Sequence, residues 1–373
     1  MYLNSTVLSW QRNRATRLTP TAAPLRSTKL AHLREQTACP DRLPCIEKYR
    51  LDPEGIDFFA GKLESLAPST KAGISVTDQV KIALDFYASG ASMNTMKNTY
   101  GLAQSTIYNI IVKVSKELKN VCLEEFVSFP GACDPWKTIL IKEGFLEYGG
   151  FPSCLGAIDG TQIKIRGPVK NEEIYVNRKG DHAINAQFVC DMNMVIRACT
   201  VKWPGSVHDS TVWRMCSLNT LLTSSSQTGW LIGDSGYPLR ERLIVPFLVP
   251  LTAAERKFNK ALKKCRCVIE RVNGVVKSRF RCLDGTNTGG LQFDPEVCCC
   301  IIASCVVLHN YCRMRALPDP EILPHILEEI RREERAEEAR AAESALRNNR
   351  PNEAVELAKG VAKRDMIVAQ YFT

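Results

Sequence analysis

Four short apolar segments between residues 154 and 236 constrain the fold more than any other feature of the chain. In order they read CLGAIDGTQIKI, AINAQFVCDMN, MVIRACTVKW and WLIGDSG. Short runs of β-branched and other apolar residues bounded by turn residues are typical of buried strands. Asp191 and Asn193 predict a tight turn between the second and third strands. An amphipathic helix is expected after the third strand and more helices from about residue 253, so the order favours an α/β fold with a mixed sheet flanked by helices.

Residues 51–135 have a helical pattern that precedes these strands. The stretch SMNTMKNTYGLAQSTIYNIIVKVSKEL predicts a short helix, a break at Gly101 and a longer helix from Gln104 or Ser105. This is helix-turn-helix spacing. The stripe expected to be buried in the longer helix is Ile107, Ile110, Ile111 and Val114. Residues near its start are left exposed as candidate contacts to a DNA major groove: Gln104, Ser105, Tyr108 and Asn109. A plain helical bundle is the alternative.

The net charge of +9 is concentrated at one end of the chain. Residues 1–50 carry nine Lys and Arg against three acids, which supplies +6 of that total. We interpret them as a basic, mostly disordered arm, which suits a polyanionic partner. A mitochondrial presequence is the less favoured reading, and no secretory signal is predicted. Residues 316–373 predict a charged helical tail, either solvated or partner-binding.

The apolar run VCCCIIASCVVL is the longest in the chain, with 12 residues at 297–308. It is shorter than the ~20 residues of a membrane span, so we expect a buried helix and no membrane association. Sixteen cysteines without a secretory signal indicate reduced intracellular thiols. One helix cannot wrap a tetrahedral zinc ion. The potential ligands on this helix are therefore interpreted as ordinary buried side chains: Cys298, Cys305, His309 and Cys312.

Asp159 lies inside the first predicted strand, where an unpaired charge is costly. The nearest cations along the chain are Lys164 and Arg166, five and seven residues further on. Both would face the opposite side of an ideal strand. Asp159 therefore needs a partner from elsewhere, and a bound cation is the interpretation that we favour.

Two further acids occur in matching contexts. Asp234 ends the fourth strand, and Glu270 lies on the polar side of a helix predicted over 265–280, together with Gly274 and Lys277. Three crowded carboxylates repel one another unless cations lie between them, and two hard divalent ions fit oxygen ligands. Each acid also has a plain explanation, because Asp-Gly and Asp-Ser-Gly are turn sequences and Glu270 could pair with a nearby arginine.

An ordered series of motifs resembles the transposases of PIF/Harbinger DNA transposons and their domesticated nuclease relatives. The motifs are GAIDGTQIKI, YVNRKGDHAINAQFVCD, KWPGSVHDSTVW, GDSGYP and VIERVNGVVKSRFRCL, and the likeness covers about residues 75–315. The resemblance implies an RNase H-like catalytic domain, here at 140–315, preceded by a helical DNA-binding region. It also implies a catalytic, metal-binding triad of Asp159, Asp234 and Glu270, with Mg²⁺ or Mn²⁺ as cofactor.

The function implied is that of a nuclease, a hydrolase that cuts phosphodiester bonds of DNA at a two-metal site. The alternative is a domesticated transposase that binds DNA or a partner protein without cutting. Relatives commonly act with a Myb-like DNA-binding protein, and a location in nucleus and cytoplasm is expected. No target sequence or oligomeric state is predicted.

Several residues of these motifs have two interpretations. Asp209 is either an additional metal ligand or a helix N-cap. Arg178 and Lys179 either hold a DNA phosphate or lie in a solvated loop, and Lys277 is a further candidate DNA contact. Asn273 departs from the family, because relatives usually have an aromatic residue at this position. The missing aromatic packing is expected to loosen the helix that carries Glu270.

Overall fold

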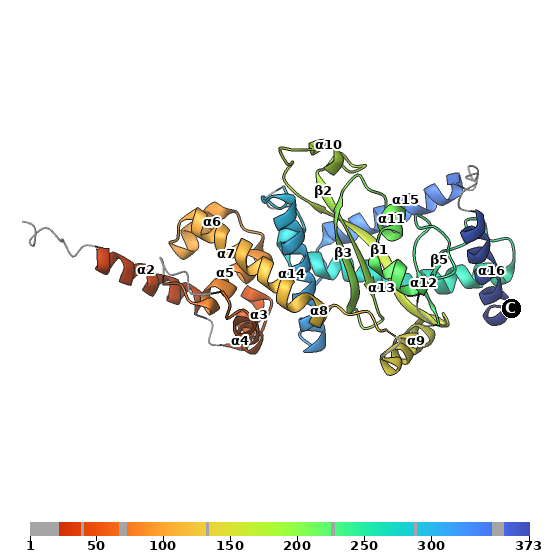
Figure 1. Cartoon of the computed structure of the whole chain (residues 1–373), viewed down its shortest axis with the longest axis horizontal. Helices are drawn as coiled ribbons and strands as arrows, with labels where there is room; N and C mark the ends of the chain where they lie inside the picture. Colours follow the sequence, from red (N-terminus) through yellow and green to blue (C-terminus); the bar gives the residue numbers. More distant parts are fainter. Residues whose placement is uncertain are drawn as a thin grey trace, which may run out of the picture.

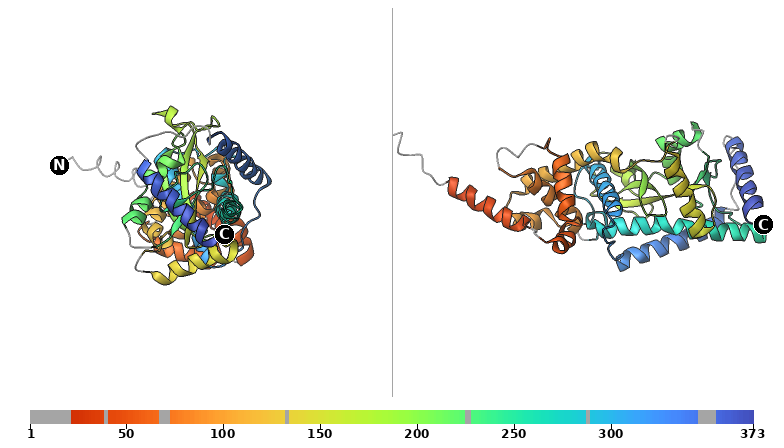
Figure 2. Two further views of the ribbon diagram at one scale, coloured as in Figure 1. Left: turned by 90° about the vertical axis from the view of Figure 1, so that its right-hand side faces the viewer. Right: turned by 90° about the horizontal axis from the view of Figure 1, so that it is seen from below.

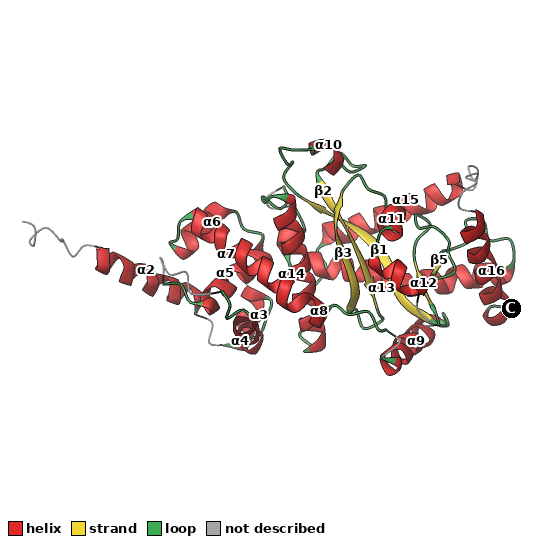
Figure 3. Cartoon of the chain, in the orientation of Figure 1, coloured by secondary structure: helices red, strands yellow, loops and turns green. Residues whose placement is uncertain are grey.

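The structure is a computed structural model that describes residues 22–38, 41–66, 73–131, 134–224, 228–286, 289–344 and 354–373. It is elongated, with a helical region at one end, a mixed sheet in the middle and the last helix at the other end (Figure 1). Figure 3 shows how few strands the chain has beside its helices.

The helical region comprises α2 (Ala22–Thr37), α3 (Arg42–Tyr49), α4 (Pro53–Lys62), α5 (Val76–Ser89), α6 (Met93–Tyr100), α7 (Gln104–Glu117) and α8 (Leu123–Phe126). A single π-helical segment, Leu118–Cys122, joins the last two. Our prediction of disorder for residues 1–50 is wrong for α2 and α3. Leu33 and Tyr49 are fully buried, and these few apolar anchors were masked in the sequence by the basic residues around them. Residues 1–21 of the predicted arm lie outside the described residues.

Helices α6 and α7 form the expected helix-turn-helix arrangement. Gly101 ends α6 in the left-handed conformation, with φ of 64°, and α7 begins at Gln104. The predicted apolar stripe is confirmed, because all four of its members are buried. Gln104, Ser105 and Asn109 are exposed, as expected. Tyr108 is a correction: it is half-buried, since its ring stacks on Phe293 with 5.0 Å between ring centroids.

The sheet has the strand order β3-β2-β1-β4-β5 and confirms the RNase H-like prediction. Its strands are β1 (Cys154–Lys164), β2 (Ala183–Cys190), β3 (Ile196–Pro204), β4 (Trp230–Ile232) and β5 (Leu243–Ile244). The first three pair antiparallel, while β1 with β4 and β4 with β5 pair parallel. The predicted turn after β2 is confirmed, since Asp191 Oδ1 accepts hydrogen bonds from the backbone of Asn193 (2.9 Å) and Val195 (3.1 Å). The two-residue β5 was not predicted.

The helices around the sheet are α9 (Pro135–Gly149), α10 (Glu172–Tyr175), α11 (Asp209–Arg214), α12 (Ser217–Ser224), α13 (Ala253–Arg279), α14 (Pro295–Met314), α15 (Pro324–Ser344) and α16 (Ala354–Tyr371). Two helices where one was expected follow β3, because the chain turns at Met215 and Cys216 between α11 and α12. Helix α13 packs against β1 and β2, and α14 packs against β3 and α7.

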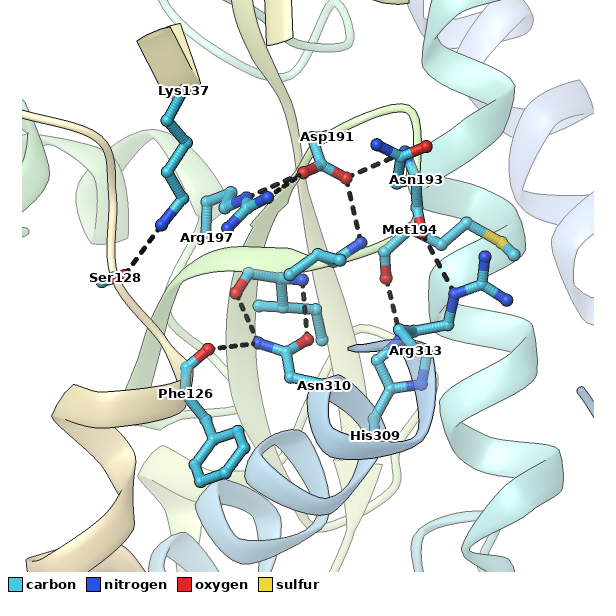
Figure 4. Close-up of polar contacts among 12 residues, drawn as sticks. Phe126, Ser128, Lys137, Asp191, Asn193, Met194, Arg197, His309, Asn310 and Arg313 are labelled. Carbon is cyan, nitrogen blue, oxygen red and sulfur yellow. Dashed lines mark hydrogen bonds and ion pairs between the residues drawn. The ribbon is translucent and has the colours of Figure 1, made fainter. Parts of the chain in front are cut away.

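Helix α14 is the predicted buried helix and joins the helical region to the sheet. By length and composition it could cross a membrane, but 83% of its apolar window is buried inside this fold. Asn310 donates hydrogen bonds to the carbonyls of Phe126 in α8 (2.8 Å) and Ile196 in β3 (2.7 Å) (Figure 4). His309 Nε2 lies 2.9 Å from the carbonyl of Met194, and burial lowers the pKa of this imidazole to about 3.

The C-terminal segment is a further correction. The sequence left a solvated helix or a partner-binding arm open, but α15 docks on α13 of its own chain, where Ile326 is buried (Figure 2). The ring of Phe372, just after α16, packs against Phe151 and Phe258, with centroid distances of 6.0 and 5.5 Å. The composition of this segment is dominated by charged residues, so it did not predict these few apolar contacts.

Candidate metal centre

The parallel pairing of β1 with β4 places two of the candidate acids side by side. Ala157 lies opposite Ile232 in that pairing. Asp159 follows two residues later on the same face of β1, and Asp234 lies two residues past the end of β4 and lines the same cavity. Asp234 also holds the turn that follows β4, because its Oδ1 accepts a hydrogen bond from Gly236 N at 3.2 Å. Asp234 therefore both stabilises the turn and lines the cavity.

Helix α13 carries the third acid over the sheet. Glu270 is half-buried and lines the same cavity as both aspartates. Arg266, Asn273 and Gly274, one turn away on the same side of the helix, are buried, so the side of α13 that the sequence predicts to be polar is itself covered. Glu270 Oε1 lies 3.4 Å from Nη2 of Arg266, one turn earlier in the helix. Glu270 therefore both pairs with an arginine and lines the acidic cavity.

Asp209 is a fourth acid in the cavity, and it is not the N-cap of its helix. The cap residue is His208, without a side-chain cap bond, so local capping does not explain Asp209. Its Oδ1 accepts a hydrogen bond of 2.8 Å from Asn185 Nδ2 on β2. A Cβ at Gly160 would overlap the Asp209 carboxylate, so glycine at 160 lets this acid approach β1 beside Asp159.

Asn273 answers part of the question of what pairs with Asp159. Its Nδ2 donates a hydrogen bond of 2.9 Å to Asp159 Oδ2. Asn273 is buried, and its Oδ1 has no hydrogen-bond partner among the described residues. We expected Asn273 to loosen α13, but its hydrogen bond to Asp159 links the helix to β1. Lys164 pairs with Asp181 at 3.1 Å and not with Asp159, which agrees with the expectation that it faces the other side of the strand.

The four acids line one cavity of about 650 Å³. Burial raises the pKa of Asp159 well above its ordinary value; the charge of Arg266 lowers it, and those of Asp234, Asp209 and Glu270 raise it further. Burial also raises the pKa of Asp209, against the hydrogen bond from Asn185. Three neighbouring carboxylates therefore oppose the charged form of Asp159, while Arg266 favours it, and such crowding of negative charge favours binding of a cation.

The donor set fits a hard divalent ion, but the side chains are not yet gathered around one. Carboxylate oxygens are the ligands that Mg²⁺ and Mn²⁺ prefer. Within the described ranges, no three His, Cys, Asp or Glu side chains stand close enough to surround an ion. To hold an ion, these carboxylates would have to lie closer together than they do here.

A basic loop between β1 and β2 forms one wall of the cavity. Asn177 Oδ1 accepts hydrogen bonds from the backbone of Lys179 (2.8 Å) and Asp181 (3.1 Å), which fixes the loop. Arg178 contacts the ring of His208, and burial together with this guanidinium lowers the pKa of that imidazole. Lys277 also lines the cavity, whereas the exposed candidates on α7 are not among its lining residues.

Sequence reasoning missed Asn185 and the bond of Asn273 as parts of this site. Tyr237, of the GDSGYP motif, is another, since its hydroxyl accepts a 3.0 Å hydrogen bond from Gln187 and burial raises its pKa well above the usual range. The sequence did contain an indication of these contacts. Asn185 and Gln187 are two amides in a strand that reads as buried, and buried polar side chains require hydrogen-bond partners.

Comparison with known proteins gives one family match to this region and several similar proteins. The family described as DDE superfamily endonuclease matches residues 158–310, which include all four acids. "Putative nuclease HARBI1" of Mus musculus is 36% identical over 238 residues, 64% of this chain and 67% of that protein. The protein of the same name from Xenopus laevis is 31% identical over 256 residues, 68% of this chain and 72% of its own length.

A plant relative is more distant. "Protein ALP1-like" of Arabidopsis thaliana is 25% identical over 269 residues, 68% of this chain and 64% of that protein. No solved structure gives a significant match.

Proposed function

Because the chain belongs to the family of Harbinger transposase-derived DDE superfamily endonucleases, we propose that it cleaves phosphodiester bonds of DNA in a divalent-metal-dependent reaction. The observation that carries this proposal is that Asp159 of β1, Asp234 just past the end of the parallel strand β4, and Glu270 of α13 line one cavity. Since DNA is the substrate, we expect the protein to act in the nucleus, where a Myb-like partner could direct it.

Asp159, Asp234 and Glu270, with Asp209 beside them, would hold Mg²⁺ or Mn²⁺. When bound, such ions neutralise the phosphodiester and activate the attacking water or hydroxyl. The chain's own groups prepare the site for them. Asn273 holds Oδ2 of Asp159, which leaves Oδ1 available, and Asn185 orients Asp209. Arg266 balances part of the negative charge until cations enter.

Two separate surfaces would hold the DNA. Arg178, Lys179 and Lys277 lie beside the acids and suit the phosphates next to the cleaved bond. The exposed start of α7, with Gln104, Ser105 and Asn109, suits a more distant stretch of duplex. Tyr108 is withdrawn from this set, because its ring stacks on Phe293.

Alanine substitutions at neighbouring positions of α7 should separate binding from folding. Asn109→Ala should weaken binding to duplex DNA while changing the free energy of unfolding by less than about 0.5 kcal/mol, because the side chain is exposed. Tyr108→Ala should cost about 2 kcal/mol through the lost stacking on Phe293. Electrophoretic mobility shifts and thermal melts measure the two effects. If Asn109→Ala leaves the DNA affinity unchanged, α6 and α7 would be part of a helical bundle that does not bind DNA.

One observation favours a second function, DNA binding without cleavage. Arg266 already stands among the carboxylates as a permanent cation, and three ligands are not pre-assembled in the described part of the chain. A protein locked in this arrangement would bind DNA through its basic loop and α7 but hold no ion. The two functions differ in a single measurable property, the metal-dependent appearance of strand breaks.

The test is metal titration of the purified full-length chain on supercoiled plasmid. We expect nicked or linear product with Mg²⁺ or Mn²⁺ and none with excess chelator. Asp181→Asn is a matched control, because this acid lines the cavity but pairs with Lys164, so its activity should stay within a few-fold of the unmodified chain. DNA binding without product at any metal concentration would establish the second function instead.

A further inference from the structure

Helix α15 forms a wall of the acidic cavity. Side chains from its first three turns line the cavity, among them Ile326, Glu329, Ile330 and Glu333. The helix approaches α13 at Gly274, one turn after Glu270, where an added Cβ would lie 3.1–3.2 Å from side-chain atoms of Ile322 and Ile330. The absence of a side chain at this point of α13 lets α15 lie close to the acids. Figure 2 shows the two helices side by side, α13 in cyan and α15 in blue.

Carboxylates of α15 hold the basic residues that we assign to DNA phosphates. Lys179 Nζ lies 3.0 Å from Glu329 Oε1 and 2.7 Å from Glu333 Oε1. Lys277 Nζ lies 3.6 Å from Glu329 Oε2. Burial acts to raise the pKa of Glu329, but Lys277 and Lys179 outweigh it and lower that pKa. Glu329 is thus a charged anion held by two cations at the edge of the metal centre.

We propose that α15 covers the phosphate-binding surface of the free protein and that DNA must displace it to reach the acidic cavity. Glu329 and Glu333 occupy the positions that backbone phosphates take when DNA is bound. This inference rests on the proposed function and adds that the DNA path next to the acids is closed by the chain's own C-terminal helix.

The attachment of α15 is suited to such an exchange. The pair of Lys179 with Glu333 is partly exposed, with 37% and 53% of the two side chains accessible, and such pairs are weak. The pair of Lys277 with Glu329 is more buried, with 11% and 30% accessible, but its two atoms are 3.6 Å apart. The apolar contact of α15 relies on few residues, of which Ile326 is buried. A DNA strand offers a continuous line of phosphates to the same lysines and releases counterions as it binds, so it can compete with two carboxylates.

The experiment measures DNA affinity of full-length variants by fluorescence anisotropy, in chelator so that no cleavage occurs. In Glu329→Gln/Glu333→Gln the hold on Lys179 and Lys277 is weakened, and we expect roughly fivefold to tenfold tighter binding of a labelled duplex. Glu321→Gln/Glu328→Gln is the matched control with the same change in net charge. Glu321 and Glu328 are exposed, and Glu328 pairs with Arg335 at 2.8 Å. The control should change affinity less than about twofold.

Ile326→Ala loosens the helix without any change in charge and should tighten DNA binding in the same direction. Hydrogen exchange on the unmodified chain gives an independent readout: duplex DNA should speed exchange of amides in residues 324–336. Equal tightening in both double variants, no tightening in Glu329→Gln/Glu333→Gln, or slower exchange in α15 on adding DNA would each overturn the inference while leaving the nuclease proposal standing. Failure of every variant to bind DNA would overturn both.

Discussion

Asp234→Asn should abolish metal-dependent cleavage and leave the protein folded. Asparagine keeps the size of the side chain and the oxygen that accepts the hydrogen bond from Gly236 N, so the turn after β4 persists. It removes a negative charge needed to hold the ions, and loss of metal catalysis should slow cleavage by at least about 10³-fold. The rate of plasmid nicking at saturating Mg²⁺ measures this loss.

The stability of the same variant separates the catalytic role from a structural one. Removing one of several crowded carboxylates relieves repulsion around Asp159, so the melting temperature of the metal-free protein should stay equal or rise slightly. DNA binding should survive, because the basic residues are untouched. Full activity of Asp234→Asn would end the proposed mechanism. An unfolded variant would instead identify Asp234 as a turn residue only.

Asp209→Asn should give the second largest effect, a change in metal requirement. If Asp209 helps to hold an ion, the metal concentration for half-maximal cleavage should rise by about tenfold or more. The amide oxygen can still accept the hydrogen bond from Asn185, and one buried charge disappears, so stability should not fall. Plasmid nicking across a Mn²⁺ titration measures the requirement. A lower melting temperature with an unchanged metal requirement would give Asp209 a purely structural role.

The heart of the site could be predicted because it follows from regular geometry. In a parallel pair of strands, residues that follow paired positions by the same number of residues lie next to each other. Asp159 and Asp234 each follow the paired residues Ala157 and Ile232 by two positions. The helical period likewise placed Glu270 on one side of α13 with Gly274 and Lys277, and all three line the cavity. Periodicity can be found in the local sequence, whereas the RNase H-like arrangement of the strands was implied by the family resemblance.

The errors came from contacts between residues far apart in the chain. Tyr108 looked exposed because its partner, Phe293, lies in another segment. For Asp209 the sequence left an N-cap and a metal ligand open; it does not cap α11, and its hydrogen bond comes from Asn185 on β2. The C-terminal helix α15 looked solvated because few apolar residues, Ile326 among them, dock it. Tertiary packing decided each case where local propensity was weak.

The most direct test of the account is to map where a divalent ion binds. Fe²⁺ can replace Mg²⁺ or Mn²⁺ at oxygen-rich sites, and with ascorbate and peroxide it cuts the polypeptide backbone close to where it is bound. We predict that the full-length chain is cut near residues 159, 209, 234 and 270, that excess Mg²⁺ suppresses these cuts, and that Asp159→Asn removes them. Cuts at other positions, or an unchanged pattern in Asp159→Asn, would contradict the assignment of the acidic cavity as a metal centre.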